Sequence, residues 1–319
     1  MSVVRVKINM KQSPLISVII PSYNHAHFLG RALQSVIDQT YVHWEVIVID
    51  NHSGDHTDEV LASFKDSRIK VLKIYNNGSI AASRNLGIRE SFGEWMAFLD
   101  SDDFWYPEKL KTIMMVIEDS DVYDVLCNDE VMVDKKTGTN TVLRYGPYEN
   151  DFYQILLVEG NRLSTSATII RREFLQRHAL AFNETVEYIT VEDYGLWLDL
   201  ARTGARFKFI DNVLGEYLVH ESNSSGSLAL HLENGERLLH YHTYNIQKFN
   251  PSPNVLWAKI ETRLQVSKLK QEIIKINLVS ALNIAFKLVI LYPFEVTAYV
   301  LFKFFRFIKR VNKNKLNFS

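Results

Sequence analysis

Short apolar segments alternate with helical patterns between Leu15 and Leu99. Four of these segments have the length and the β-branched or aromatic content of buried strands: Ile16–Ile20, Trp44–Ile49, Ile69–Ile74 and Glu94–Leu99. Apolar residues at helical spacing follow each of the first three segments, the last of them over Ile80–Glu90. Strands and helices that alternate in this way predict a parallel sheet with helices on both faces.

Polar residues follow three of these predicted strands. They are Ser22-Tyr23-Asn24, Asp50-Asn51 and Asp100-Ser101-Asp102-Asp103. Parallel strands bring such ends to one edge of the sheet, where α/β proteins bind ligands. The chain has neither a G-x-G-x-x-G fingerprint nor a P-loop, so we expect a nucleotide to be held in another way.

The third of these polar strand ends, Asp100 to Asp103, is rich in negative charge. Asp100, Asp102 and Asp103 place three carboxylates within four residues, and such groups repel one another unless a cation lies between them. A solvated acidic turn is the simpler interpretation of a lone D-x-D. The neighbouring polar tips favour a divalent cation instead.

The predicted strands and helices divide the chain into three parts. We predict an N-terminal arm over residues 1–14, a catalytic domain over 15–225 and a helical C-terminal region over 226–319. Within the catalytic domain, further strands are expected at residues 166–170, 207–210 and 215–220, with a hairpin around 135–138. Helices are expected at 171–178 and 192–201.

Six short motifs occur in the order typical of one enzyme family. They are Pro21-Ser22-Tyr23-Asn24, Asp50 to Thr57, Ala81 to Gly87, Asp100 to Asp103, Glu192-Asp193, and Tyr217 through His220 to Ser225. Together they resemble a family 2 glycosyltransferase over about the first 225 residues. The resemblance implies an α/β GT-A fold, a Rossmann-like and mostly parallel sheet flanked by helices, followed here by the helical C-terminal region.

The resemblance assigns one set of residues to the nucleotide-sugar. They are Pro21, Tyr23, Asp50, Asn51, Arg84, Asp100 and Ser101. Tyr23 would lie against the base, and Asp50 would form hydrogen bonds with polar groups at the edge of the nucleoside. Asn51 departs from the family, which often has a second acid there, and this weakens the choice of uridine over thymidine. Arg84 would contact the base or the phosphates, with a salt bridge to nearby acids as its alternative.

A divalent cation is the implied cofactor, either Mn²⁺ or Mg²⁺. Asp102 would be its direct ligand, and His220 would contact the metal or the diphosphate. Asp100 would face the ribose or reach the metal through water. Asp103 has two open roles, in the metal site or as the cap of a helix that begins near Pro107.

The Glu192-Asp193 motif implies the acceptor side of the reaction. Asp193 is the candidate general base that takes the proton from the acceptor hydroxyl, with N-capping of a helix as the alternative. Glu192 would orient the acceptor, and Trp197 would wall its pocket or belong to the core. One base and one in-line displacement predict inversion at the anomeric carbon.

The C-terminal region suggests a membrane surface as a partner. Asn277–Phe307 is largely apolar, and Lys303 to Ser319 carries six basic residues and no acid. The net charge of −1 therefore leaves about −7 on the rest of the chain, which argues against nucleic-acid binding. An apolar face with a basic edge predicts a helix lying on anionic lipid. A homodimer interface or a helical lid is the alternative.

A reducing compartment fits the single cysteine, Cys127, which excludes an intrachain disulfide. Residues 1–11 lack an apolar core of signal-peptide length, and we find no uninterrupted apolar run of the roughly 18 residues that a spanning helix needs. We expect a cytoplasmic enzyme, peripheral on the inner face of the cell membrane.

The expected reaction is inverting, metal-dependent transfer of a hexose or N-acetylhexosamine from a UDP-sugar to a hydroxyl of a glycan. The acceptor implied is a bacterial surface polysaccharide such as an O-antigen, on a lipid carrier. Two alternatives stay open at this point: a transferase that uses dTDP-rhamnose, and a non-catalytic membrane-associated protein that binds nucleotide-sugars.

Overall fold

The computed structural model of the chain describes residues 13–120, 122–220, 228–246, 252–274, 277–301 and 303. Contacts divide the chain into two units, Met1–Asn150 with Arg162–Leu228, and Asp151–Asn161 with Ala229–Ser319. The predicted catalytic domain is continuous over residues 15–225, whereas Asp151–Asn161 groups with the helical unit. Most of the basic C-terminal segment, and the Glu221–Ser225 part of the last motif, lie outside the described residues.

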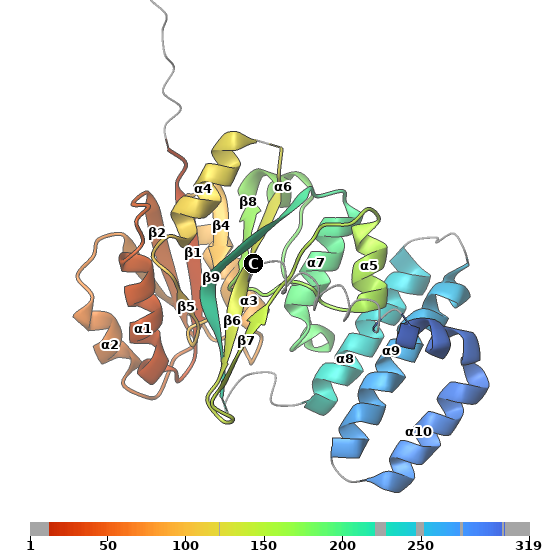
Figure 1. Cartoon of the computed structure of the whole chain (residues 1–319). Helices are drawn as coiled ribbons and strands as arrows, with labels where there is room; N and C mark the ends of the chain where they lie inside the picture. Colours follow the sequence, from red (N-terminus) through yellow and green to blue (C-terminus); the bar gives the residue numbers. More distant parts are fainter. Residues whose placement is uncertain are drawn as a thin grey trace, which may run out of the picture. The chain divides into compact units, whose positions relative to one another are not determined.

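The first unit contains one mixed sheet (Figure 1). Its strands are β1 (Ile16–Ser22), β2 (Trp44–Asp50), β3 (Ile69–Lys73), β4 (Trp95–Phe98), β5 (Phe104–Trp105), β6 (Val125–Asp134), β7 (Thr139–Leu143), β8 (Thr168–Arg171) and β9 (Phe207–Val219). The order is β3-β2-β1-β4-β8-β6-β9-β5, with β7 paired to β6. The first four strands are parallel, as predicted, and β8 runs antiparallel between β4 and β6.

Helices cover both faces of this sheet. The unit contains α1 (Ala26–Ile37), α2 (Thr57–Ser63), α3 (Ile80–Glu90), α4 (Lys109–Asp119), α6 (Arg172–Arg177), the short η1 (Val186–Tyr188) and α7 (Glu192–Arg202). Apolar residues of α1, α2 and α4 form one buried cluster with Val18 and Val46 of the sheet. On the opposite face, Phe98 contacts Phe182, which in turn contacts Trp197 of α7.

Gly87 explains why α3 can lie so close to the sheet. A Cβ atom at this position would be 2.5 Å from Cγ2 of Ile19 and 2.9 Å from Cδ1 of Ile49. Both distances are too short for carbon atoms in contact. The glycine therefore permits the close approach of α3 to β1 and β2, which brings the other polar residues of α3 to the ends of those strands.

The last strand differs from the prediction. Two strands were expected at residues 207–210 and 215–220, but β9 is continuous over Phe207–Val219. Its pairing with β6 shifts register beside Asn128 and Asp129, so a bulge absorbs the polar interruption that suggested a break. The two-residue strand β5, which pairs with β9, was not predicted.

The second unit is helical. It contains α5 (Phe152–Glu159), α8 (Leu228–Tyr241), a π-helical turn η3 (His242–Ile246), α9 (Pro253–Ile274) and α10 (Leu278–Leu291). Polar contacts tie these helices together: the Tyr153 hydroxyl lies 3.0 Å from Nδ1 of His242, and the Tyr292 hydroxyl donates to Glu261 at 2.6 Å. These hydrogen bonds join helices of the second unit to one another.

Replacement of two helical glycines by alanine tests the packing of α3. Gly87→Ala should lower the free energy of unfolding by about 1–3 kcal/mol, because its methyl group overpacks against Ile19. Gly30→Ala in α1 is the matched control: the nearest atom is 3.6 Å away, and we expect a gain of up to about 1 kcal/mol from helix propensity. Urea unfolding measures both. Equal effects of the two variants would contradict the close approach.

Candidate active site

The structure brings the predicted polar strand ends together. In the parallel register, Ser22 of β1 lies opposite Asp50 of β2, and the amide of Asn51 donates to the Ser22 carbonyl at 2.9 Å. On the other side of β1, the amide of Leu99 donates to the Ile19 carbonyl at 3.1 Å. Asp100 therefore begins its turn at the same edge of the sheet as Ser22 and Asp50.

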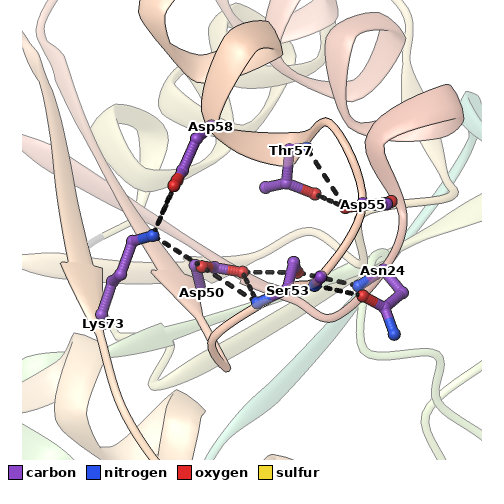
Figure 2. A network of polar contacts seen from close by, with 8 residues as sticks. Asn24, Asp50, Ser53, Asp55, Thr57, Asp58 and Lys73 are labelled. Atoms are coloured by element: carbon purple, nitrogen blue, oxygen red, sulfur yellow. Dashed lines mark hydrogen bonds and ion pairs between the residues drawn. The ribbon is translucent and has the colours of Figure 1, made fainter.

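Asp50 organises the loop that follows β2 (Figure 2). Its buried carboxylate accepts a hydrogen bond from the Ser53 hydroxyl at 2.6 Å and from the Ser53 amide at 3.2 Å. Lys73 of β3 lies 3.6 Å from Asp50 and 2.8 Å from Asp58. Asp50 thus stabilises the loop after β2 through Ser53 and also lies at the edge of the sheet where the strands end.

The same loop is bonded to the loop that follows β1. The Asn24 amide donates to the Ser53 hydroxyl at 2.8 Å, and the Asn24 side chain accepts from the Gly54 amide at 2.8 Å. Asp55 accepts from the amide of Ala26, the first residue of α1, at 3.0 Å and from the Thr57 hydroxyl at 2.5 Å. Several motif residues therefore have a direct structural role in joining the two loops.

Exposed aromatic groups border this edge. Tyr23 is 57% exposed, and the rings of His52 and Tyr75 stack with centroids 3.7 Å apart. The side chain of Asn51 accepts a hydrogen bond from the Asn76 amide at 3.0 Å. Sequence reasoning missed His52 and Tyr75, although His52 lies inside a motif at a variable position.

Arg84 of α3 connects two acidic parts of the site. Its guanidinium is buried and lies 2.7 Å from Asp100 and 2.8 Å from Glu192. Burial acts to lower the pKa of Arg84, but Asp100 and Glu192 raise it overall, so the group stays charged. These are the salt bridges considered as the alternative role of Arg84. Contact with a base or phosphate stays a prediction.

Asn85, the next residue of α3, holds the loop before α7. Its amide nitrogen donates to the Phe182 carbonyl and to the Glu184 carboxylate, both at 2.8 Å. Its oxygen accepts from the Phe182 amide at 3.0 Å. The Arg-Asn pair of the motif therefore connects α3 both to the Asp100 turn and to the chain that leads into α7.

Asp193 lies in the first turn of α7, next to this ion pair. The N-cap position of α7 is Val191, and the Asp193 carboxylate accepts a hydrogen bond from the amide of Tyr194 in the same turn at 2.6 Å. Burial and then the adjacent Glu192 carboxylate raise the pKa of Asp193 to about 7, while Arg84 acts to lower it. A carboxyl group with this pKa can accept and release a proton near neutral pH.

The other two residues predicted for the acceptor side are buried. One oxygen of Glu192 bonds Arg84, and the other has no hydrogen-bond partner among the described residues. Trp197 is fully buried and packs against Phe182, in agreement with the core role left open for it. A contact with an acceptor stays a prediction for both.

The Asp100 to Asp103 turn meets two histidines. Nε2 of His220, at the end of β9, lies 2.8 Å from Asp102, and Nδ1 of His25 lies 2.8 Å from the Ser101 hydroxyl. The two imidazole rings are 6.0 Å apart. Burial and then Asp100 raise the pKa of Asp102, while His220 lowers it. His25 was not predicted, since it follows the first motif rather than belonging to it.

The side chains at this turn suit a metal ion that takes some of its ligands from the protein and the others from the substrate. Within the described ranges, no three His, Cys, Asp or Glu side chains are grouped to hold a metal. Asp102 and His220 supply two adjacent donors. In nucleotide sites, Mg²⁺ and similar ions use one or two carboxylates and complete their coordination with phosphate oxygens and water. The set present here matches that arrangement.

Asp103 has a different place from its neighbours. It is buried, and α4 begins at Lys109 with Glu108 in the N-cap position. Of the two roles left open for Asp103, the structure therefore does not support capping of this helix. Its carboxylate instead bonds Ser166 and the backbone of β9.

Comparison with known proteins gives a family and a fold. The Glycosyl transferase family 2 model matches residues 17–178. A curated relative from Escherichia coli, the UDP-Glc:alpha-D-GlcNAc-diphosphoundecaprenol beta-1,3-glucosyltransferase WfgD, is 30% identical over 188 residues, which are 59% of this chain and 70% of the relative.

Two solved structures share the fold. TarS of S. aureus, residues 1–349 in complex with UDP-GlcNAc, has a TM-score of 0.61 and 21% identity, and the match covers 77% of this chain and 70% of that 1–349 chain. The mannosyltransferase PcManGT of Pyrobaculum calidifontis, in complex with GDP-Man and Mn²⁺, has a TM-score of 0.56 and 18% identity, covering 91% of this chain and 86% of that protein.

Proposed function

Because the chain belongs to glycosyl transferase family 2 and has the GT-A fold, we propose that it transfers a sugar from a nucleotide-activated donor to a glycan hydroxyl. We propose a UDP-hexose or a UDP-N-acetylhexosamine as donor and a lipid-linked bacterial surface polysaccharide as acceptor. The observation that carries the proposal is the position of Arg84, which bonds both the Asp100 turn and the Glu192-Asp193 turn.

The donor assignment follows from the polar strand ends. The exposed ring of Tyr23 is available to lie against a uracil, with Asp50 and Asn51 near its polar edges. Pro21, near the end of β1, and Ser101, in the turn after β4, complete the proposed nucleotide side. The Escherichia coli relative is named for UDP-Glc, which supports uridine over the thymidine of a dTDP-rhamnose transferase.

We assign the diphosphate to the Asp100 turn. Asp102 is the proposed direct ligand of Mn²⁺ or Mg²⁺, His220 lies beside it, and Asp100 faces the ribose or a metal-bound water. Such an ion, when bound, stabilises the negative charge that develops on the leaving diphosphate. Arg84 keeps Asp100 in place through its ion pair.

Asp193 is the proposed general base. It removes the proton from the acceptor hydroxyl while that oxygen attacks the anomeric carbon and the nucleoside diphosphate leaves. A single displacement of this kind inverts the anomeric configuration. Glu192, held by Arg84, is proposed to orient the acceptor, and Trp197 to support that side of the site through Phe182.

A membrane surface is the proposed location of the acceptor reaction. Large apolar side chains are exposed in and after α10, including Leu282 (71%), Phe286 (68%) and Phe294 (85%). Among the described helices, none alone has the length and apolarity to cross a bilayer, whereas Val279–Leu291 and Pro293–Leu301 meet that test only as a pair bent by 104°. An apolar surface with basic residues after it suits a helix in the plane of anionic lipid, at the inner face of the cell membrane.

A panel of nucleotide-sugars tests the reaction. With Mn²⁺ and an undecaprenyl-diphosphate-linked glycan, we expect release of UDP from one UDP-sugar and transfer of its sugar. If only dTDP-rhamnose is turned over, the UDP-sugar assignment is wrong and the enzyme is a dTDP-rhamnose transferase. Binding of nucleotide-sugar without any transfer would favour a non-catalytic binding protein.

The pH dependence of transfer tests Asp193. Only the deprotonated carboxylate accepts a proton, so kcat should fall about tenfold per pH unit below a pKa near 7 and level off above it. Asp193→Asn should reduce kcat by at least about 100-fold at every pH. Asp199→Asn, on the same helix and paired with Arg202 at the surface, is the control and should keep wild-type activity. A fully active Asp193→Asn enzyme would refute the assignment.

Vesicle flotation tests the membrane surface. The full chain should bind vesicles that contain phosphatidylglycerol, and Phe286→Glu should weaken this binding about tenfold or more, because the burial of one phenyl ring contributes about 1.5–3 kcal/mol. Phe92→Glu is the control, since Phe92 is 79% exposed but lies in the first unit. If the two variants bind alike, α10 is not the lipid contact. A wild-type dimer that Phe286→Glu dissociates would identify this surface as a subunit interface.

A further inference from the structure

Ser166 is a buried residue just before β8 that contacts the turn at the end of β4. Its hydroxyl accepts a hydrogen bond from the amide of Asp100 at 3.0 Å and donates one to the carboxylate of Asp103. The side chain is 1% exposed. A single hydroxyl therefore bonds the first and last acid of the Asp100 to Asp103 turn.

The backbone of Ser166 holds the next part of the chain. Its carbonyl accepts from the indole nitrogen of Trp105 at 2.9 Å and from the ammonium group of Lys109 at 3.0 Å. Both of these side chains are fully buried. Ser166 thus contacts four residues between positions 100 and 109, so the path of the acidic turn depends on it.

Asp103 extends this contact to β9. Its second carboxylate oxygen accepts a hydrogen bond from the amide of Leu218 at 2.9 Å. His220 lies two residues further on, with Nε2 2.8 Å from Asp102. Asp103 therefore fixes the end of β9 relative to the turn, at the place where Asp102 and His220 meet.

We propose that Ser166 and Asp103 are positioning residues that hold Asp102 and His220 at the spacing needed to bind the metal–diphosphate group of the donor. This inference rests on the proposed function. Both positioning side chains are buried, and their oxygens bond protein groups. They act through the neighbouring residues and do not touch the substrate themselves.

Direct binding of Mn²⁺ distinguishes this role from a general contribution to stability. The loss of the free Mn²⁺ signal in electron paramagnetic resonance, titrated with UDP present, gives the affinity without any turnover. Ser166→Ala should weaken Mn²⁺ binding at least tenfold, because the Asp100 and Asp103 bonds to the hydroxyl are both lost.

Ser35→Ala is the matched control. Ser35 is equally buried, and its hydroxyl accepts from the backbone amide of Trp105 at 3.3 Å, but it bonds neither Asp100 nor Asp103 in the described structure. We expect a similar change in thermal unfolding temperature for the two serine variants, with Mn²⁺ affinity unchanged in Ser35→Ala. Equal Mn²⁺ affinity in Ser166→Ala and the wild type would overturn the inference.

Asp103→Asn is the second variant, and it decides the question if Ser166→Ala does not fold. Its amide keeps an oxygen for the Leu218 amide and loses the carboxylate acceptor of the Ser166 hydroxyl, so we expect an intermediate, roughly threefold or greater, loss of Mn²⁺ affinity. Unchanged affinity would count against the inference. A wild-type protein that binds neither Mn²⁺ nor UDP would instead refute the proposed function.

Discussion

One buried guanidinium group connects the parts of this site. Arg84 lies on α3, Asp100 follows β4, and Glu192 begins α7, so a single cation forms ion pairs with acids from two separate segments. A buried charge without a partner is strongly unfavourable, and removing one member of a buried pair commonly costs about 3–5 kcal/mol. The two acidic turns can therefore be packed at one edge of the sheet only while Arg84 lies between them.

The motif residues on α3 act together to make this possible. Gly87 lets the helix approach Ile19 and Ile49 closely, and Asn85 bonds the loop that leads into α7. Arg84 then reaches both acidic turns from a helix that is fixed at two points. Motif residues that the sequence analysis assigned to the substrate thus also bond other parts of the described fold. The proposed catalytic groups depend on these bonds for their positions.

Sequence reasoning predicted local structure better than contacts across the fold. The bounds predicted for α3 match Ile80–Glu90, because apolar spacing and turn residues are local properties. The continuity of β9 could not be predicted, since it depends on a bulge in its pairing with β6. The same holds for His25 and Ser166: neither is marked by its neighbours in sequence, and each meets the acidic turn only through the packing of distant segments.

The most direct test of this account is a double-mutant cycle on the unfolding free energies of Asp100→Asn, Glu192→Gln and the double variant. In each single variant Arg84 keeps one ion-pair partner, whereas in the double variant it loses both and keeps only the longer-range attraction of Asp193. We predict that the double variant loses at least about 1 kcal/mol more than the sum of the single losses. Losses that add to within about 0.5 kcal/mol would contradict the claim that Arg84 joins the two turns into one unit.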